Sequence, residues 1–226
     1  MKHISFILDG NRRYAKKYGI TMVESYEIGC SKVNEIVLFI NENYKEVENI
    51  SLWAFSKNNN RRDPQEIELI LSVIENKTIE QDLVKSFKCE FIGDFKENQR
   101  MNNLIEKYKR INSEIKEFKS TLKLNIFINY CGTDDLIFTV NNILKEKPNL
   151  NFENIDKILE FSQTKFIPSI DFVVRTGGNK RLSDYCMNLL RFSEIYFLEK
   201  YWGEFCIDDL KNIISDFKKT KQNYGK

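Results

Sequence analysis

Short apolar runs alternate with longer segments of helical periodicity along the whole chain, and this alternation limits the possible folds most strongly. The runs are rich in Ile, Val, Phe and Leu, and most read as continuous rather than alternating, which is typical of strands covered on both faces. They occupy residues 3–8, 49–55, 89–92, 122–128, 170–174 and 195–198. Helical patterns lie at about 26–44, 64–86, 97–119, 133–146, 152–162 and 208–221. Strands that alternate with helices in this way predict an α/β fold, with a mostly parallel six-stranded sheet flanked by helices.

Capping residues mark the starts of several predicted helices. Asp63 followed by Pro64 is a typical start, with the aspartate as N-cap and the proline in the first turn. Thr133, which precedes two aspartates, predicts a second N-cap. Asn151 and Asn154 are the candidates for capping the helix near 155–161.

The chain has 226 residues, with 9 Gly and 3 Pro and no linker-like stretch, so we expect a single domain over residues 1–226. It begins directly with a strand-like run, too short for a secretory signal. No apolar run approaches the roughly 18 residues that a membrane-spanning helix needs. We therefore expect a cytoplasmic protein.

Charge, cysteine and histidine content exclude several kinds of function. A formal net charge of +2 gives no general attraction to nucleic acid. The five cysteines are scattered without a C-x-x-C pair, which indicates reduced thiols rather than a zinc site or a disulfide framework. His3 is the single histidine, so a Ser-His-Asp triad or a multi-histidine metal site would have to be built around this one residue.

Polar residues follow the predicted strands where ligands bind in parallel sheets, beyond the carboxyl ends. The first strand is followed by Asp9-Gly10-Asn11-Arg12-Arg13. A carboxylate, a glycine and two arginines suit a metal-bridged diphosphate, with Mg²⁺ on the carboxylate and backbone amides facing the anion. Taken alone, the segment fits equally well an Asp-Gly turn that caps a helix and leaves the arginines in solvent.

A second basic segment follows the fifth predicted strand. A Gly-Gly turn is surrounded by Arg175, Lys180, Arg181 and Ser183. The guanidinium group of one arginine can bind two phosphate oxygens at the same time. The segment lacks the P-loop motif G-x-x-x-x-G-K-[ST], so it does not indicate nucleotide hydrolysis. A charged surface turn is the alternative.

Two further features have an ordinary structural explanation. Arg61 and Arg62, beside three asparagines, read singly as a polar loop. The apolar residues of 64–86 and 97–119 line either a cavity or an ordinary core.

Together the basic segments predict two anion sites and a divalent cation. Such a site favours chemistry driven by stabilisation of a leaving diphosphate, because cations absorb the charge that develops on it.

The motifs quoted above occur in an order that resembles the cis-prenyltransferases, most closely the bacterial undecaprenyl diphosphate synthases (isoprenyl transferases). The resemblance extends from about His3 to Gly225. It rests on Ile7-Leu8-Asp9-Gly10-Asn11-x-Arg13, Ala54-Phe55-Ser56 with Asn59 and Arg62, Ile92-Gly93-Asp94, Asn129-Tyr130, Arg175-Thr-Gly-Gly-x-x-Arg181-Leu-Ser183 and Glu194-x-x-Phe197.

The resemblance implies a homodimer with a hydrophobic tunnel and Mg²⁺-dependent addition of isopentenyl diphosphate to an allylic primer such as farnesyl diphosphate. Each addition creates a cis double bond. The implied product is undecaprenyl diphosphate, the lipid carrier for cell-wall polymers. A product of this kind must leave to a bilayer, so transient peripheral contact with the membrane is expected.

Residue by residue, the resemblance makes Asp9 the catalytic aspartate that engages magnesium, Asn59 the proton acceptor and Glu194 a second magnesium contact. The residues that match the allylic diphosphate site are Gly10, Asn11, Arg12, Arg13, Tyr14, Met22 and Tyr26. Those that match the substrate-reaching loop are Ser56, Lys57, Asn58 and Asn60. Those that match the isopentenyl diphosphate site are Arg62, Arg175, Arg181, Leu182 and Ser183.

Several positions depart from the family pattern. Arg12 stands in place of a glycine, and Met22 and Tyr26 in place of an arginine and a histidine. We hypothesise that Arg12 supplies the charge that Met22 lacks. The other departures are Tyr14 for tryptophan, Asn58 for glutamate, Asn60 for tryptophan, Lys180 for histidine and Asn223-Tyr224-Gly225 for R-x-G.

Two other functions stay open. One is a short- or medium-chain cis-prenyl diphosphate synthase, in which bulky tunnel residues stop elongation. The other is a non-catalytic partner subunit that supports a second chain.

Overall fold

The computed structural model of the chain describes residues 1–80, 83–95, 98–147 and 155–220, without the side chains of 78–80. It contains one six-stranded sheet of order β3-β4-β2-β1-β5-β6, and every strand pair is parallel. The strands are β1 (His3–Ile7), β2 (Asn49–Ser56), β3 (Lys88–Ile92), β4 (Lys123–Tyr130), β5 (Phe172–Arg175) and β6 (Glu194–Phe197). All six predicted strands are confirmed, and so is the α/β fold class.

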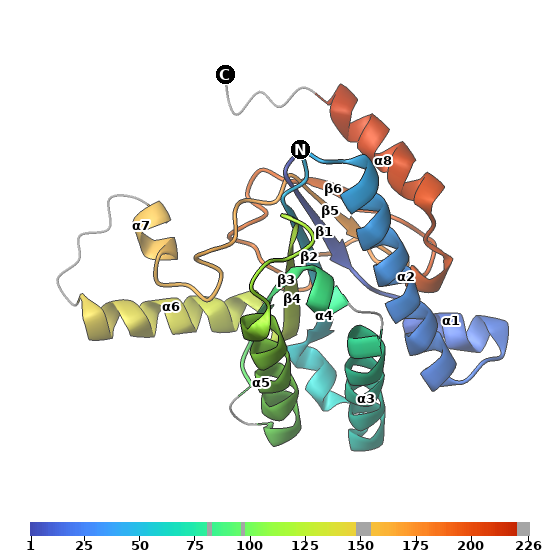
Figure 1. The fold of residues 1–226 in the computed structure, drawn as a ribbon, viewed down its shortest axis with the longest axis horizontal. Coiled ribbons are helices and arrows are strands. Elements are labelled where there is room, and N and C mark those ends of the chain that lie inside the picture. The colour runs from blue at the N-terminus through green and yellow to red at the C-terminus, as the bar shows by residue number, and fades with distance from the viewer. Residues whose placement is uncertain (81–82, 96–97, 148–154, 221–226) are drawn as a thin grey trace.

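Helices pack on one face of this sheet around the larger of two apolar clusters (Figure 1). They are α2 (Met22–Asn43), α3 (Pro64–Glu80), α4 (Leu83–Ser86), α5 (Gln99–Glu114) and α8 (Ile207–Lys219). The short helix α1 (Asn11–Tyr18) follows β1 and contacts α2. Trp202, on a short 3-10 helix (Trp202–Glu204), packs against Phe6 and Phe205 within the same cluster.

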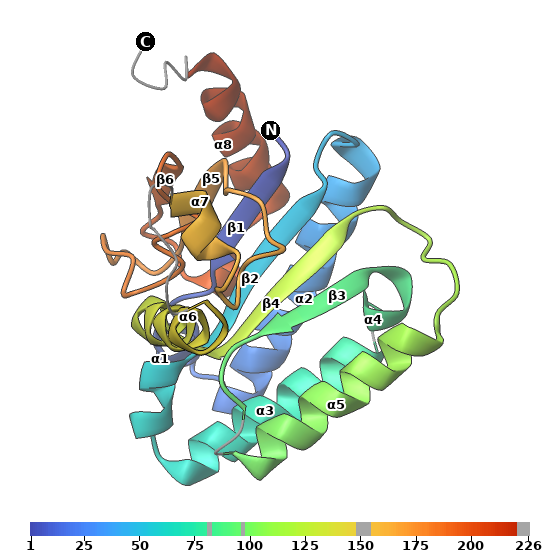
Figure 2. The ribbon, with the colours of Figure 1, turned by 90° about the vertical axis from the view of Figure 1, so that its left-hand side faces the viewer.

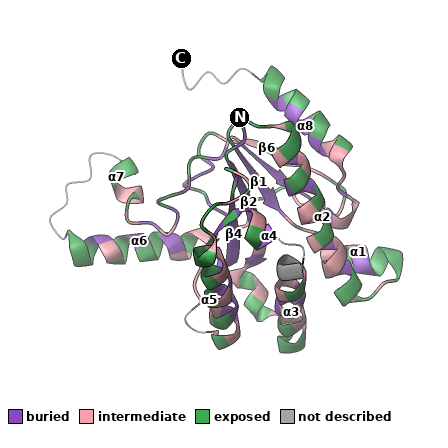
Figure 3. Ribbon diagram, in the orientation of Figure 1, coloured by how far each residue is buried: buried purple, intermediate pink, exposed green. Residues whose placement is uncertain are grey.

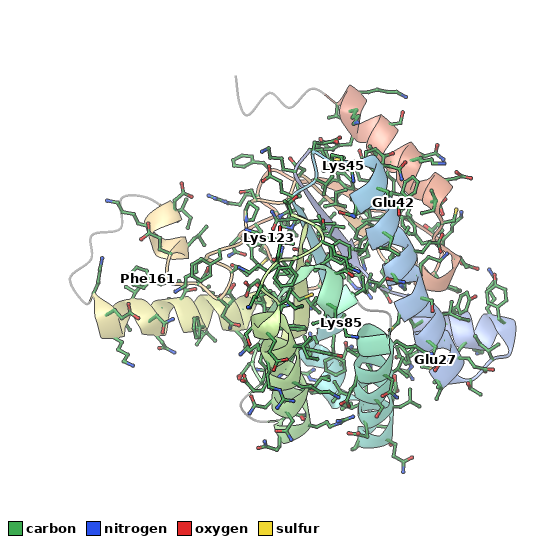
Figure 4. All side chains as sticks on the ribbon, in the orientation of Figure 1. Glu27, Glu42, Lys45, Lys85, Lys123 and Phe161 are labelled. Carbon is green, nitrogen blue, oxygen red and sulfur yellow. The ribbon has the colours of Figure 1, made fainter. Side chains whose placement is uncertain are left out.

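The opposite face is covered mainly by the irregular chain before and after β5, which contributes Ile167, Ile170, Tyr185 and Leu189 to the second cluster. Helix α6 (Gly132–Glu146) projects away from the sheet, and Figure 2 shows it end-on in front of the strands. Helix α7 (Ile155–Leu159) accompanies it, and the Phe161 carbonyl accepts a hydrogen bond from Asn142 of α6 (Figure 4).

In the two central strands, β1 and β2, apolar and polar residues alternate, whereas the sequence predicted mostly continuous apolar strands. Ile4 and Phe6 face the helices, whereas His3 and Ser5 point to the second face and are almost fully buried. These polar side chains are paired there: His3 Nε2 lies 2.7 Å from the Ser51 hydroxyl, and Ser5 Oγ lies 2.8 Å from the Tyr185 hydroxyl. Both faces are covered, as predicted, but one buries a polar network.

Several helix starts differ from the predicted ones. Helix α1 was not among the predicted helices, and α2 begins at Met22 because Thr21 and Glu24 form a capping box. The start of α3 at Pro64 is confirmed, and Asp63 accepts a hydrogen bond from the Gln65 amide at 2.8 Å. Thr133 is not an N-cap, since α6 already begins at Gly132 after Cys131.

Helix ends also differ. The predicted helix 64–86 is described as two helices, α3 and α4, and α5 ends at Glu114 rather than near 119. The proposed caps Asn151 and Asn154 lie outside the described residues. None of the described helices is both long and apolar enough to cross a bilayer. All five cysteines are free thiols.

Candidate active site

A polar pocket opens at the carboxyl ends of β1, β2 and β5. Ile7 pairs with Trp53 on one side and with Arg175 on the other, so the segments that follow these strands meet at one edge. The residues that line the pocket are Ile7, Leu8, Asp9, Gly10, Asn11, Arg12, Arg13, Lys16, Tyr26, Trp53, Ala54, Phe55, Ser56, Asn58, Asn59, Arg62, Ile70, Arg175, Asn179, Arg181 and Ser183.

Asp9 lies at the centre of a group of cationic and amide donors. Its Oδ2 accepts hydrogen bonds from Arg175 Nη2 at 2.9 Å and Asn179 Nδ2 at 3.0 Å, and its Oδ1 accepts one from Arg13 Nη2 at 3.1 Å. Burial alone would raise the pKa of this carboxyl. The hydrogen bonds from Arg175 and Asn179, with the charges of Arg175 and Arg13, outweigh burial and hold the pKa below its ordinary value. Asp9 is therefore a carboxylate at neutral pH.

Arg175 organises the second basic segment. Its side chain is 6% exposed, and its Nη1 donates to the Ser183 hydroxyl at 2.9 Å and to the Arg181 carbonyl. Among the described residues, its buried Nε has no hydrogen-bond partner. A buried guanidinium with a spare donor is a strong candidate for binding an anion.

Two glycines let the backbone come close to these charged groups. Gly177 has a φ of +87°, and a Cβ there would lie 2.7 Å from Arg13 Nη2. Gly10 has a φ of +108°, and a Cβ there would lie 2.8 Å from the Tyr201 ring. Arg13 donates to the Gly177 carbonyl at 2.6 Å, so the two basic segments are tied together.

The start of α1 faces the same pocket. Gly10 is the N-cap, no side chain caps the helix, and its first turn has no acidic residue. The first amides of a helix lack partners within the helix and attract anions. An anion beside Asp9 therefore meets backbone donors as well as arginines.

A second charged group lies on the α3 side of the pocket. Arg62 Nη1 donates to the Tyr26 hydroxyl at 2.9 Å and to Glu66 Oε1 at 3.0 Å. Arg12 Nε lies 3.7 Å from the same Glu66 oxygen. Burial raises the pKa of Tyr26, so this hydroxyl stays protonated.

Only some residues of the loop after β2 line the pocket. Ser56, Asn58 and Asn59 line it, and the Asn59 carboxamide oxygen accepts a hydrogen bond from the Ser56 amide at 2.9 Å. Lys57 pairs with Asp134 instead, and Asn60 donates to Asn129 at 2.6 Å.

Some predicted site residues lie elsewhere in the described part of the chain. Those that do not line the polar pocket are Tyr14, Met22, Lys57, Asn60, Leu182 and Glu194. Glu194 is level with Phe172, whereas Phe197 is level with Arg175. Three residues of strand separate the two levels, about 10 Å, so Glu194 lies toward the opposite edge of the sheet from Asp9.

Sequence reasoning missed three polar residues at the site. Asn179 occupies a variable position of the Arg175–Ser183 motif, and nothing in the sequence singles it out. Lys16 lies one helical turn beyond Arg12, a spacing that puts both on one face of α1. Glu66 lies in the first turn of α3, and its position in the sequence does not indicate that it pairs with Arg62 and Arg12.

An apolar pocket continues from the polar one. Leu8, Asn11, Tyr26, Ala54 and Ile70 line both. The space in the apolar pocket that water molecules can occupy is about 90 Å³. The other residues that line it are Gly29, Cys30, Val33, Leu52, Val73, Ile74, Leu83, Leu124, Ile126 and Trp202.

This apolar pocket is deep. Leu124 comes six residues before Tyr130, the last residue of β4. At 3.3 Å per residue it lies about 20 Å from the carboxyl edge where the polar pocket opens. The shape suits a molecule with a charged head and a long hydrocarbon tail.

The donor set fits one kind of metal site. The described residues contain no group of three His, Cys, Asp or Glu that would hold a metal by themselves. Mg²⁺ is often bound by one or two carboxylates together with phosphate oxygens of the substrate. Asp9 fits that mode, in which the metal enters with a diphosphate.

Comparisons with known proteins agree with this geometry. Residues 7–225 match the Prenyltransf family model of undecaprenyl diphosphate synthases. The tritrans,polycis-undecaprenyl-diphosphate synthase (geranylgeranyl-diphosphate specific) of Pyrobaculum aerophilum is 31% identical over 231 residues, 99% of this chain and 95% of that protein. The isoprenyl transferase of Wolinella succinogenes is 28% identical, covering 100% and 96%.

A solved structure shows the same fold. Lavandulyl diphosphate synthase from Lavandula x intermedia, crystallised with dimethylallyl diphosphate, superposes with a TM-score of 0.88. The match covers 100% of this chain and 98% of that one at 22% sequence identity. At that identity, the comparison supports the sheet order and helix arrangement described above.

Proposed function

This chain belongs to the undecaprenyl diphosphate synthase family and is a cis-prenyltransferase, and we propose that it adds isopentenyl diphosphate units to an allylic diphosphate primer, giving undecaprenyl diphosphate. The observation that carries this proposal is the junction of a basic pocket with a deep apolar one through Leu8, Ala54 and Ile70. The first matches two diphosphates, and the second matches a growing hydrocarbon chain.

We assign the two diphosphates to two sets of donors. The allylic diphosphate would bind at Asp9, Arg13 and the amides at the start of α1. The isopentenyl diphosphate would bind at Arg175, Arg181 and Ser183. Two diphosphates repel each other, so the cations must neutralise them before the reacting carbons can meet.

The reaction breaks the allylic C–O bond, forms a carbon–carbon bond to isopentenyl diphosphate and releases one proton. Charge builds on the departing diphosphate, and we assign Arg13 to stabilising that charge by hydrogen bonds. Asp9 would hold Mg²⁺, which neutralises charge on the leaving diphosphate when bound. Asn59 is a weak base whose oxygen already accepts a hydrogen bond, so we assign it to orienting the proton's route.

Primer and product length are part of the proposal. We expect farnesyl diphosphate as primer. The Pyrobaculum relative is named as specific for geranylgeranyl diphosphate, so this longer primer is the direct competitor. A short- or medium-chain product remains the alternative for product length.

We further propose that the enzyme is a homodimer through α6. This helix exposes Leu136, Ile137, Val140 and Leu144, each at least 46% exposed, and Figure 3 shows α6 exposed along much of its length. Adjoining apolar side chains of this size on a projecting helix are typical of a surface that another chain covers. We expect action in the cytoplasm, a role in cell-wall lipid carrier synthesis, and brief membrane contact when the product leaves.

The test is incorporation of labelled isopentenyl diphosphate by the purified chain with Mg²⁺. Dimethylallyl, farnesyl and geranylgeranyl diphosphate are supplied in parallel, and chain length is read by thin-layer chromatography. We expect extension of the farnesyl primer and a fall of at least 100-fold in Asp9→Ala. A folded chain that incorporates no label with any primer would support the non-catalytic partner subunit instead.

A further inference from the structure

The loop between β2 and α3 is held in place by polar contacts rather than by burial. Its 3-10 helix, η1 (Lys57–Arg61), has no buried residue. A segment without apolar burial opens easily, so its few polar contacts decide its position. Two neighbouring residues of this loop, Asn58 and Asn59, line the polar pocket.

The first contact joins the loop to α6. The Lys57 ammonium pairs with the Asp134 carboxylate, and the two side chains are 41% and 28% exposed. The hydrogen bond to Asp134 raises the pKa of Lys57, with smaller contributions from Cys131 and Asp94. The carboxylates that act on this ammonium are therefore Asp134 on α6 and, more weakly, Asp94 in the segment after β3.

The second contact joins the loop to the end of β4. Asn60 Nδ2 donates to Asn129 Oδ1 at 2.6 Å, and Asn129 Nδ2 donates to the Asp94 carbonyl. Asn129 is 7% exposed and has a φ of +51°, a backbone conformation that asparagine tolerates better than most residues. Its carboxamide thus connects the loop to the segment after β3.

The other end of the loop is tied to α2 and α3. Arg62 donates to Tyr26 and to Glu66. The loop therefore lies along the pocket between two sets of contacts, with Asp134 and Asn129 at one end and the Tyr26–Glu66 pair at the other.

We propose that Asp134 and Asn129 are positioning residues that fix the loop between β2 and α3 through Lys57 and Asn60. Neither lines the polar pocket, and each contacts a residue of the loop, Lys57 or Asn60. This inference rests on the proposed function only for its kinetic part. A different role for Lys57, direct binding of a diphosphate with Asp134 as a competitor, predicts the opposite effect of removing Asp134.

The test compares Asp134→Ala, Lys57→Met and the double variant by two measurements. The first is the rate of tryptic cleavage after Arg61 and Arg62 in the folded enzyme. The second is the split between kcat and KM for isopentenyl diphosphate. For a half-exposed ion pair, we expect each single variant to raise both the cleavage rate and the KM about fivefold, with kcat changed less than twofold.

Two comparisons make this pattern specific. The double variant should be no worse than either single one, because both remove the same contact. Lys57→Arg keeps the positive charge, so its cleavage rate and its KM for isopentenyl diphosphate should equal those of the wild type. Glu106→Gln, which breaks the exposed Glu106–Lys109 pair on α5, should change neither measurement.

Asn129→Gly provides a second route to the same conclusion. Glycine accepts the positive φ without a steric clash, so this variant removes both side-chain hydrogen bonds without straining the backbone. It should raise the cleavage rate as Asp134→Ala does.

The proposal is overturned if Asp134→Ala leaves cleavage unchanged, or if it lowers the KM. Cleavage is measured without substrate, so a chain that proved inactive would still decide whether the loop is clamped.

Discussion

At the scale of single residues, the charged pair Asp9 and Arg175 connects the two basic segments that the sequence could only treat separately. Their order and residue types predicted that an anion site would form at this edge of the sheet. The contact itself depends on β5 pairing with β1, and residues 166 positions apart carry no local signal for that. Asn179 was missed for the same reason, since its role comes only from pointing at Asp9.

The single histidine predicts a loss of stability in acid. His3 Nδ1 lies 2.8 Å from the Pro168 carbonyl, which can only accept, so Nε2 accepts from Ser51. Burial lowers the pKa of this imidazole to about 4, against 6.5 for an ordinary one. The unfolded chain takes up the proton first as pH falls, so stability is lost between pH 6.5 and 4.

The expected size of this effect is about 2 kcal/mol between pH 7.5 and pH 5. Urea unfolding of the wild type and of His3→Gln at both pH values measures it. The variant should lose less stability than the wild type over this interval. Equal losses in the two proteins would show that His3 is not the titrating group.

Compared with the family pattern, this chain has an arginine at position 12 in place of a glycine and Met22 in place of an arginine. This difference predicts an effect on primer binding. Arg12 lines the polar pocket beside Glu66, whereas Met22 does not line it. If Arg12 supplies the missing cation, Arg12→Gly should raise the primer KM tenfold or more. Because glycine also weakens a helix by about 1 kcal/mol, Arg12→Ala and Arg12→Lys are measured beside it.

Arg12→Ala should weaken primer binding as Arg12→Gly does, and Arg12→Lys should retain most of it. An unchanged primer KM in both neutral variants would refute the compensation.

At the scale of elements, strands were predicted well and short polar elements poorly. The six apolar runs are long enough to be unambiguous, and Asp63-Pro64 marked the start of α3. Helix α1 has eight residues, most of them polar, and only Ala15 is buried, so the sequence there holds too few apolar residues to mark a helix. The buried polar residues His3, Ser5 and Ser51 also broke the expectation of continuous apolar strands, because each satisfies its hydrogen bonds within the second face.

The exposed apolar side of α6 leads to a prediction about assembly. If another copy covers this helix, Ile137→Lys places an unpaired charge in the interface, which costs several kcal/mol. We expect the dimer dissociation constant to rise about 100-fold or more, as measured by analytical ultracentrifugation. Leu38→Lys, at an exposed apolar position of α2, is the matched control.

The control should leave the dimer intact. An Ile137→Lys variant that dimerises as tightly as the wild type would place the interface elsewhere.

At the scale of the whole molecule, the strand order decides what the chain can do. Composition and periodicity predicted a parallel sheet, but not which strands would be central. The order puts β1, β2 and β5 together, so their loops form one pocket, and β2 and β4 form the floor of the apolar cavity. The sequence left open whether the apolar residues of 64–86 line a cavity or a core, and the structure shows both: Ile74 and Leu83 line the cavity, whereas Leu71 does not.

The end of this cavity that lies toward the amino ends of the strands, where Leu124 lines it, predicts product length. Leu83 lies on α4, which leads into the amino end of β3, far from the pocket mouth. Leu83→Ala should enlarge the cavity and lengthen the product by one or more isoprene units, at a cost of about 2–5 kcal/mol in stability. Thin-layer chromatography of labelled products measures the length.

Leu71→Ala is the matched control, because Leu71 is buried in the same core but does not line the cavity. It should cost similar stability and leave product length unchanged. Equal product lengths in the two variants and the wild type would mean that the cavity end does not limit elongation.

The most direct test of the proposed reaction is a crystal structure with Mg²⁺, isopentenyl diphosphate and a non-reactive farnesyl thiolodiphosphate. We expect one diphosphate on Arg175, Arg181 and Ser183 and the other beside Asp9 and Arg13, with the farnesyl tail in the apolar cavity beyond Ala54. Reactants bound away from these groups, or a tail outside the cavity, would contradict it.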